Sequence, residues 1–344
     1  MEEGLLPRSS VPETKSNTKS IADGDSSVTS VVVLSTLVSI CGSFAYGCTA
    51  GYSSPAESGI MEDLQLSVAA YSVFGSLTTV GGIIGSFMNG IIPDLIGRKG
   101  TMWLSELLCI FGWLAIAFSK GAWLLDIGRL STGIGAGMIA YVVPIYIAEI
   151  TPKDVRGGFT QASQLMMTCG FSLMFFLGTI VSWRTLAFIG SVPCLLQVFG
   201  LFFIPESPRW LAKIGREKEL ETTLQSFRGK NADVLRAADI KDYTKTFERD
   251  SEAGILNMFQ RRYAYSLLVN VVGLMALQQL GGSTAIGYYA SSIFEEADFS
   301  TSLGTVSMAI ILIPASCVST LLIDNLEDDP FFWFLTVECA YVFS

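Results

Sequence analysis

Histidine is absent from the 344-residue sequence, and charged residues make up only 15% of it. Without imidazole, the chain can have no histidine base, no histidine proton relay and no histidine-ligated zinc ion. The seven cysteines lie in apolar stretches without metal-ligand spacing, which indicates small buried hydrophobic residues. No nucleophile and base form a recognisable pair, so the sequence predicts neither an enzyme nor a bound cofactor or metal ion.

Apolar residues are abundant, since hydrophobic residues form 50% of the sequence and 33 further residues are glycine. This composition is typical of an all-α polytopic membrane protein. Stretches with little or no charge that could cross a bilayer occur at 28–47, 68–93, 101–119, 122–148, 158–182, 186–204, 265–294 and 299–323. A ninth apolar stretch, 331–344, is shorter than the roughly 20 residues that a crossing requires.

Basic residues gather on one side of these spans. They precede the first span, follow the second and the fourth, and are dense between 209 and 262, whereas the other side has only Lys120 and Arg184. The positive-inside rule therefore predicts a cytosolic N-terminus. The net charge of -9 comes from acidic residues spread over loops and the tail, and nothing indicates a nucleic-acid partner.

One stretch places polar groups inside an apolar span. No charge occurs between 263 and 294, yet the amides of Gln278 and Gln279 lie there with several hydroxyl and phenol groups. On a helix, Gly281 and Gly282 share the face of Gln278, so a ligand or another helix could approach closely. Neutral donors and acceptors suit a polyhydroxylated neutral molecule better than an ion. The alternative is that these groups only join helices through hydrogen bonds.

Clusters of acids and bases follow the second, fourth and sixth spans, all on the predicted cytosolic side. In the first cluster Asp94 can pair with a base, Gly97 allows a sharp turn, and Arg98 offers a planar fork for a carboxylate. Each cluster alone could be an ordinary solvated loop, but three together favour a coordinated gate. The predicted gate residues are Asp94, Arg98, Glu149, Arg156, Glu206 and Arg209.

Several motifs occur together across roughly residues 30–324. They are Gly90-xxx-Asp94-xx-Gly97-Arg98-Lys99, Gly128-Arg129, Glu149 with Arg156-Gly157, Pro205-Glu206-Ser207-Pro208-Arg209, and Gln278-Gln279 with Tyr288-Tyr289. In combination they resemble the sugar-porter family of the major facilitator superfamily, a superfamily built from inverted repeats. The region 47–55 and the short loops are most similar to the plant early-responsive-to-dehydration-like monosaccharide transporters.

The resemblance implies a major facilitator fold with four segments. These are a disordered cytosolic tail at 1–27, a complete N-terminal six-helix bundle at 28–204, a cytosolic helical linker at 205–264 and part of a C-terminal transmembrane bundle at 265–344. Family members carry a second basic motif after the eighth helix, whereas the stretch 324–330 is acidic here. We therefore expect a C-terminal truncation, from a truncated isoform, a shifted reading frame or an incomplete gene model. The expected location is the plasma membrane or the vacuolar membrane.

The resemblance also implies a substrate site. Its residues would be Gln164, Gln278, Gln279 and Tyr288, with Thr284 where similar transporters have an asparagine. A threonine hydroxyl can bind a sugar through fewer simultaneous hydrogen bonds than an amide.

Energy coupling is predicted from one helix pair. Proton-driven relatives resemble one another in having a first-helix aspartate beside the arginine that Arg129 matches, but that position is Thr49 here. Because threonine cannot titrate, we expect facilitated diffusion. Asp126, one turn before Arg129, could replace the missing acid, so a proton-coupled symporter is the alternative.

A third hypothesis belongs to a different class. The chain could be a transport-inactive membrane protein that associates with full-length transporters and regulates them. The expected partners are therefore a small sugar and the lipid bilayer. The symport alternative adds protons, and the regulatory hypothesis adds intact transporters.

Overall fold

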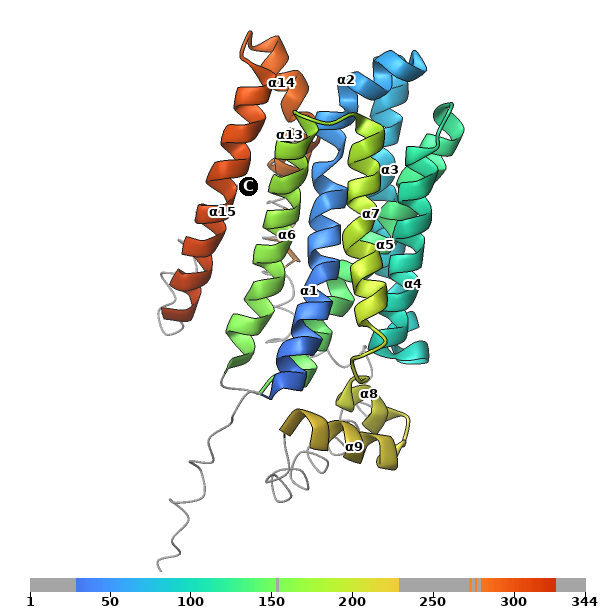
Figure 1. Ribbon diagram of the computed structural model, residues 1–344, viewed down its shortest axis with the longest axis vertical. Coiled ribbons are helices and arrows are strands. Elements are labelled where there is room, and N and C mark those ends of the chain that lie inside the picture. The colour runs from blue at the N-terminus through green and yellow to red at the C-terminus, as the bar shows by residue number, and fades with distance from the viewer. Residues whose placement is uncertain (1–28, 153–154, 229–271, 274–275, 277–279, 326–344) are drawn as a thin grey trace, which may run out of the picture.

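The computed structural model describes residues 29–152, 155–228, 272–273, 276 and 280–325. All regular structure in these ranges is helical, and Figure 1 shows the long helices side by side. The helices are α1 (Ser30–Gly51), α2 (Ser53–Leu64), α3 (Val68–Met88), α4 (Ile92–Ala117), α5 (Ala122–Ile150), α6 (Arg156–Gly178), α7 (Trp183–Gly200), α8 (Pro208–Lys213), α9 (Glu217–Arg228), α13 (Ser283–Tyr288), α14 (Ala290–Glu296) and α15 (Thr301–Asn325).

The predicted all-α membrane fold is confirmed. Helices α1, α3, α4, α5 and α15 are long and apolar enough to cross a bilayer. Helices α6 and α7, which also match predicted spans, lie in the same bundle (Figure 1). The buried core of the described chain joins side chains from α1 through α7, among them Trp113, Tyr146 and Trp183.

The predicted span 265–294 is interrupted in its described part. Gly282 has φ +79°, a left-handed conformation, and precedes the six residues of α13. A second break follows at Tyr289, after which α14 begins. Adjacent glycines lower helix propensity, and glycine adopts positive φ without steric cost. A span that the apolar run predicts as continuous is therefore divided near its end.

Glycine allows the helices of the N-terminal half to pack with their backbones almost in contact. A Cβ atom on Gly81 of α3 would lie 2.5 Å from the carbonyl oxygen of Leu130 on α5. Likewise, a Cβ atom on Gly133 of α5 would lie 2.6 Å from the carbonyl oxygen of Thr78 on α3. The high glycine content thus serves close helix packing, as is usual between membrane helices.

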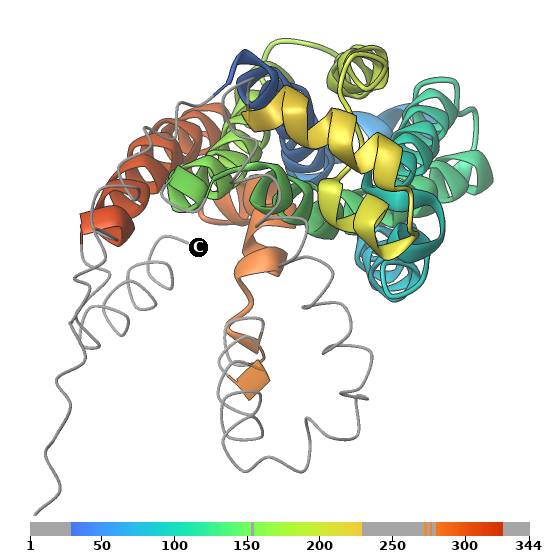
Figure 2. The same ribbon diagram turned by 90° about the horizontal axis from the view of Figure 1, so that it is seen from below.

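The C-terminal helices contact the N-terminal half at two places. Helix α15 lies beside α6 in Figure 1, and Phe175 of α6 packs against Ala290 and Ala309. Helix α14 meets α2 at the upper end of the bundle in Figure 1. The short helices α8 and α9 cover the opposite end, where Figure 2 views them from below.

The close contact between α3 and α5 predicts different outcomes at two neighbouring glycines. Gly81→Ala should destabilise the protein by about 1 to 3 kcal/mol, because the new methyl group overlaps the backbone of α5. Gly82→Ala should be neutral or stabilising by up to about 1 kcal/mol, because a Cβ atom there meets no atom of the described residues within 4 Å. Thermal unfolding in detergent measures both, and equal losses of stability would contradict this packing.

Candidate functional site

Gln164 lies on the face of α6 that the C-terminal helices contact. Four residues further along this face, Thr168 Oγ1 lies 3.5 Å from Ser316 Oγ of α15. Seven residues further along, the Phe171 ring lies 3.6 Å from where a Cβ atom on Gly287 of α13 would be. Residues at this spacing share one side of a helix. The side chain of Gln164 is exposed. Its amide is therefore accessible beside the contact between the two halves.

Of the other predicted substrate residues, only Tyr288 has a described side chain. It is half-buried at the end of α13, within electrostatic reach of Tyr46 and of Arg129. The backbone of Thr284 belongs to α13, but its side chain lies outside the described structure. Gln278 and Gln279 also lie outside the described residues. The predicted meeting of these five residues around one solute therefore remains a prediction.

Arg129 is a fully buried cation without an acidic partner among the described residues. Its Nη2 donates to Ser53 Oγ, while Nε and Nη1 have no hydrogen-bond partner in the ranges that the structure describes. The guanidinium lies 5.7 Å from the ring centre of Tyr52 and 5.2 Å from that of Phe74. Aromatic faces attract a cation by up to about 2 kcal/mol when it is desolvated. They offset only part of the cost of burying this charge.

Neither predicted coupling partner pairs with Arg129. Thr49 is buried and donates its hydroxyl to the carbonyl oxygen of Ala45, 3.0 Å away in its own helix. Asp126 is half-buried one turn before Arg129, but no ion pair joins the two within the part of the chain that the structure describes. The i to i+3 contact that could have replaced a first-helix acid is not formed in this conformation.

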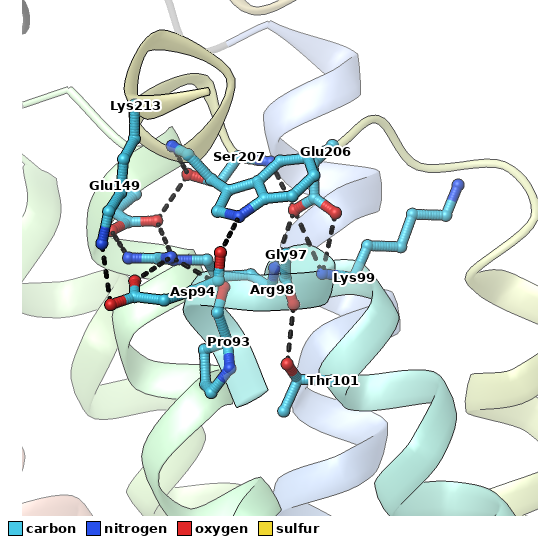
Figure 3. A network of polar contacts seen from close by, with 11 residues as sticks. Pro93, Asp94, Gly97, Arg98, Lys99, Thr101, Glu149, Glu206, Ser207 and Lys213 are labelled. Carbon is cyan, nitrogen blue, oxygen red and sulfur yellow. Dashed lines mark hydrogen bonds and ion pairs between the residues drawn. The ribbon is translucent and has the colours of Figure 1, made fainter. Parts of the chain in front are cut away.

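A polar network, here called the Arg98 cluster, forms at the end of the bundle near α8 (Figure 3). It begins with Gly97, whose φ of +83° and ψ of 173° are almost exclusive to glycine. This turn presents the backbone amides of Arg98 and Lys99 to Glu206 Oε1 at 3.0 and 3.1 Å. The amide of Ser207 donates to the same oxygen at 2.8 Å. Burial raises the pKa of Glu206, while these amides and Arg98 act in the opposite direction.

Arg98 and Glu149 form the central ion pair of the cluster. The guanidinium binds the carboxylate through Nε at 3.0 Å and Nη2 at 3.1 Å, with exposed side-chain fractions of 13% and 7%. This fork geometry is the strong form of a charge-assisted hydrogen bond. Ser207 Oγ also donates to Glu149, and Lys213 Nζ pairs with Asp94 Oδ2 at 2.7 Å (Figure 3).

The structure therefore brings together four of the six predicted gate residues: Asp94, Arg98, Glu149 and Glu206. Arg156 begins α6, and no interaction among the described residues joins it to the cluster. Arg209 lies on the exposed side of α8. The cluster joins α4, α5, α8 and the segment before α8, and none of its bonds reaches α13, α14 or α15 within the described chain.

A second polar contact, at the opposite end of the bundle, was not predicted. Ser54 Oγ of α2 lies 2.7 Å from Ser291 Oγ and accepts the backbone amide of Ser291 at 2.8 Å. Ser292 Oγ donates to Glu57 Oε2 at 2.5 Å. These bonds join the two halves directly. The sequence features that could have indicated this contact are Glu57, the first acid after the first span, and the two serines that follow Tyr288-Tyr289.

The forked ion pair predicts different effects for two arginine replacements. Arg98→Lys should destabilise the protein by about 1.5 to 3 kcal/mol, because an ammonium group cannot keep both bonds to the buried Glu149. Arg184→Lys should cost less than about 1 kcal/mol, because its pair with Asp63 has exposed fractions of 41% and 49%. Melting temperatures in detergent compare the two variants. An equal decrease would contradict a larger stability contribution from the buried pair than from the exposed one.

Comparison with known proteins places the chain in a family. The family model described as sugar (and other) transporter matches residues 13–339. From Arabidopsis thaliana, sugar transporter ESL1 is 52% identical over 304 residues, covering 88% of this chain and 64% of the relative. Sugar transporter ERD6-like 11 is 48% identical over 326 residues, covering 94% and 67%. The chain thus spans about two thirds of the length of these relatives.

Solved structures confirm the fold. The major facilitator superfamily proton:xylose symporter XylE bound to 6-bromo-6-deoxy-D-glucose has a TM-score of 0.74 and 21% identity, covering 86% of this chain and 70% of that one. A partially occluded inward-open form of XylE from E. coli has a TM-score of 0.72. The predicted resemblance to plant sugar porters, and the prediction that the protein is not an enzyme, are both confirmed. The chain therefore belongs to the sugar (and other) transporter family, and it has the fold of XylE, a protein of the major facilitator superfamily.

Proposed function

We propose that the protein transports a monosaccharide across a membrane by alternating access. The observation that carries this proposal is the accessible amide of Gln164 on the face of α6 that meets α13 and α15. An uncharged donor and acceptor at the boundary of two helical halves suits a hydroxyl-rich neutral solute. Tyr288, from the other half, would add a phenol. Gln278, Gln279 and Thr284 would complete the site.

Facilitated diffusion is the mode that the N-terminal half favours. Arg129 has no acidic partner in the described part of the chain, and the hydroxyl of Thr49 is bound within its own helix. A proton-coupled cycle needs a group that gains and loses charge between conformations. The pair of positions that would supply it holds a threonine and a permanently charged arginine.

The two polar contacts define the ends of the proposed pathway. The Arg98 cluster lies on the cytosolic side if the N-terminus is cytosolic, as the basic residues predict. Glu57 and the serine contacts then lie on the outer side and hold it closed in this conformation. In this scheme the Arg98 cluster keeps the cytosolic ends of α4 and α5 fixed to α8 while the halves move. The protein would be a multi-pass protein of the plasma membrane or the vacuolar membrane.

Sugar uptake tests the proposal directly. Expressed in yeast that lacks hexose transporters, the chain should support saturable uptake of labelled hexose. Gln164→Ala should reduce uptake at least about tenfold if one or two hydrogen bonds are lost, whereas Gln164→Asn, which keeps an amide, should lose less. Equal membrane abundance of the variants is the control.

Absence of uptake would contradict the proposal for this chain. If uptake by a co-expressed full-length relative were lowered at the same time, the alternative of a regulatory partner of intact transporters would be favoured. Uptake that Gln164→Ala leaves unchanged would place the sugar elsewhere.

A proton-coupled cycle is the second candidate, and Glu57 is the observation that favours it. Burial raises the pKa of Glu57, Glu295 raises it further, and the hydrogen bond from Ser292 acts in the opposite direction. A carboxyl whose pKa is raised in the closed contact binds a proton more tightly there than when exposed to water. Protonation therefore stabilises the closed outer contact. This stabilisation is complete below the ordinary pKa of 4.5 and is lost as the pH rises through the raised pKa.

Sugar-induced alkalinisation of the medium separates the two modes. Facilitated diffusion predicts no alkalinisation. Coupled transport predicts alkalinisation that is lost in Glu57→Gln if Glu57 carries the proton, or in Asp126→Asn if Asp126 does. The exposed Glu62 of α2 supplies the matched control Glu62→Gln. Alkalinisation that survives both Glu57→Gln and Asp126→Asn would exclude both acids as the coupling group.

A further inference from the structure

A carboxylate and two cysteines meet in the interior of the N-terminal half. Glu106 and Cys109 belong to α4, and Cys194 belongs to α7. One ligand atom from each lies within 4.8 Å of the others, and no side chain of the three is more than 1% exposed. The cysteines are far apart in the sequence, so their linear spacing gave no sign of this cluster.

Glu106 lacks the partners that a buried carboxylate requires. Neither of its oxygens makes a hydrogen bond of ordinary geometry among the described residues, and no ion pair there includes it. An unpaired carboxylate in an apolar interior costs several kcal/mol, unless a proton or a cation neutralises it. The buried arginine of the same half, Arg129, is directed to Ser53, Tyr52 and Phe74.

Further donor atoms lie one turn away on both helices. Met102 precedes Glu106 by four residues, and Gln197 follows Cys194 by three, so each shares the inward face of its helix. Gln197 Nε2 lies 3.6 Å from Met102 Sδ, which shows that these two side chains meet. The Oε1 atom of Gln197 is buried and has no hydrogen-bond partner within the described structure.

We propose that Glu106, Cys109 and Cys194 bind one divalent d10 cation, with Zn²⁺ as the natural class and Cd²⁺ as its probe. Two sulfur atoms and one carboxylate oxygen are a ligand set that zinc accepts at tetrahedral sites, with Met102 or Gln197 adjacent for a fourth position. Magnesium and calcium prefer oxygen ligands and do not suit two sulfurs.

Binding changes protonation but not oxidation state. The two thiols lose their protons to solvent and become thiolates, and the cation replaces whatever proton Glu106 held. The bound ion would connect α4 to α7. Arg98 lies near the start of α4, and the chain after α7 leads to Glu206. The ion would therefore stiffen the half that holds the Arg98 cluster. This inference does not depend on sugar transport.

Metal content and a spectroscopic probe test the site on the full chain. Protein produced with added zinc and purified in detergent with a phosphine reductant should retain about one zinc per chain, measured by elemental mass spectrometry. Zinc-free protein should give the thiolate-to-Cd²⁺ charge-transfer band in the ultraviolet on titration with CdCl₂. Cys109→Ser and Cys194→Ser should lose the band, and Glu106→Gln should weaken Cd²⁺ affinity at least about tenfold.

Cys48→Ser is the matched control, because Cys48 is buried in the same half but lies outside the cluster. It should keep both the zinc and the band. Melting temperatures without metal identify any variant that fails to fold. If a serine variant fails to fold, the nearly isosteric Glu106→Gln provides the test. Wild-type protein without zinc or a Cd²⁺ band, or with a band unchanged in Cys194→Ser, would overturn the proposal and leave Glu106 neutralised by a proton.

Discussion

The structure depends on how a bundle of apolar helices neutralises the charges that it buries. Water and long-range screening are scarce in such an interior, so each buried charge needs a partner from the chain itself. Arg98 and Glu149 meet this requirement with a forked pair of hydrogen bonds of 3.0 and 3.1 Å. Arg129 meets it only in part, through one hydroxyl and two aromatic faces. Among the described residues Glu106 has no hydrogen bond of ordinary geometry, which is why we propose a cation there.

Glycine determines how the N-terminal half is assembled. At Gly81 and Gly133 the absence of a side chain lets α3 and α5 approach until their backbones touch. At Gly97 it allows a backbone conformation that turns two amides toward Glu206, where a Cβ atom would lie 2.4 Å from Oε2. The same residue type thus accounts for the close packing inside the bundle and for the polar cluster at its end.

The two ends of the bundle are held by different kinds of contact. The Arg98 cluster uses charges and lies within the N-terminal half and α8. The contact between α2 and α14 joins the two halves and uses serine hydroxyls and a single carboxylate. A few hydrogen bonds of about 1 kcal/mol each can form and break during a conformational cycle. A contact of this strength between the halves is consistent with a proposed cycle in which the outer side opens and closes.

The helical membrane fold and the family follow from the amino-acid sequence alone. Long charge-free runs can satisfy their backbone hydrogen bonds in lipid only as helices, and the motifs around Arg98, Glu149 and Glu206 are local and specific. Four of the six residues that the sequence predicted as a gate, Asp94, Arg98, Glu149 and Glu206, lie together, because Gly97 and the Pro205–Arg209 segment encode their own turns. The sequence did not predict that Arg156 lies apart from that cluster.

Which distant residues meet depends on how the whole chain packs. The isolation of Arg129 from Asp126 depends on side-chain direction within a packed bundle, which residue spacing does not specify. The contacts of Ser54 with Ser291 and of Glu57 with Ser292 join positions more than two hundred residues apart, and no local pattern encodes them. The meeting of Cys109 with Cys194 follows from how α4 packs on α7. Periodicity fixes the face of a helix, but the neighbour of that face is chosen by the packing of the whole bundle.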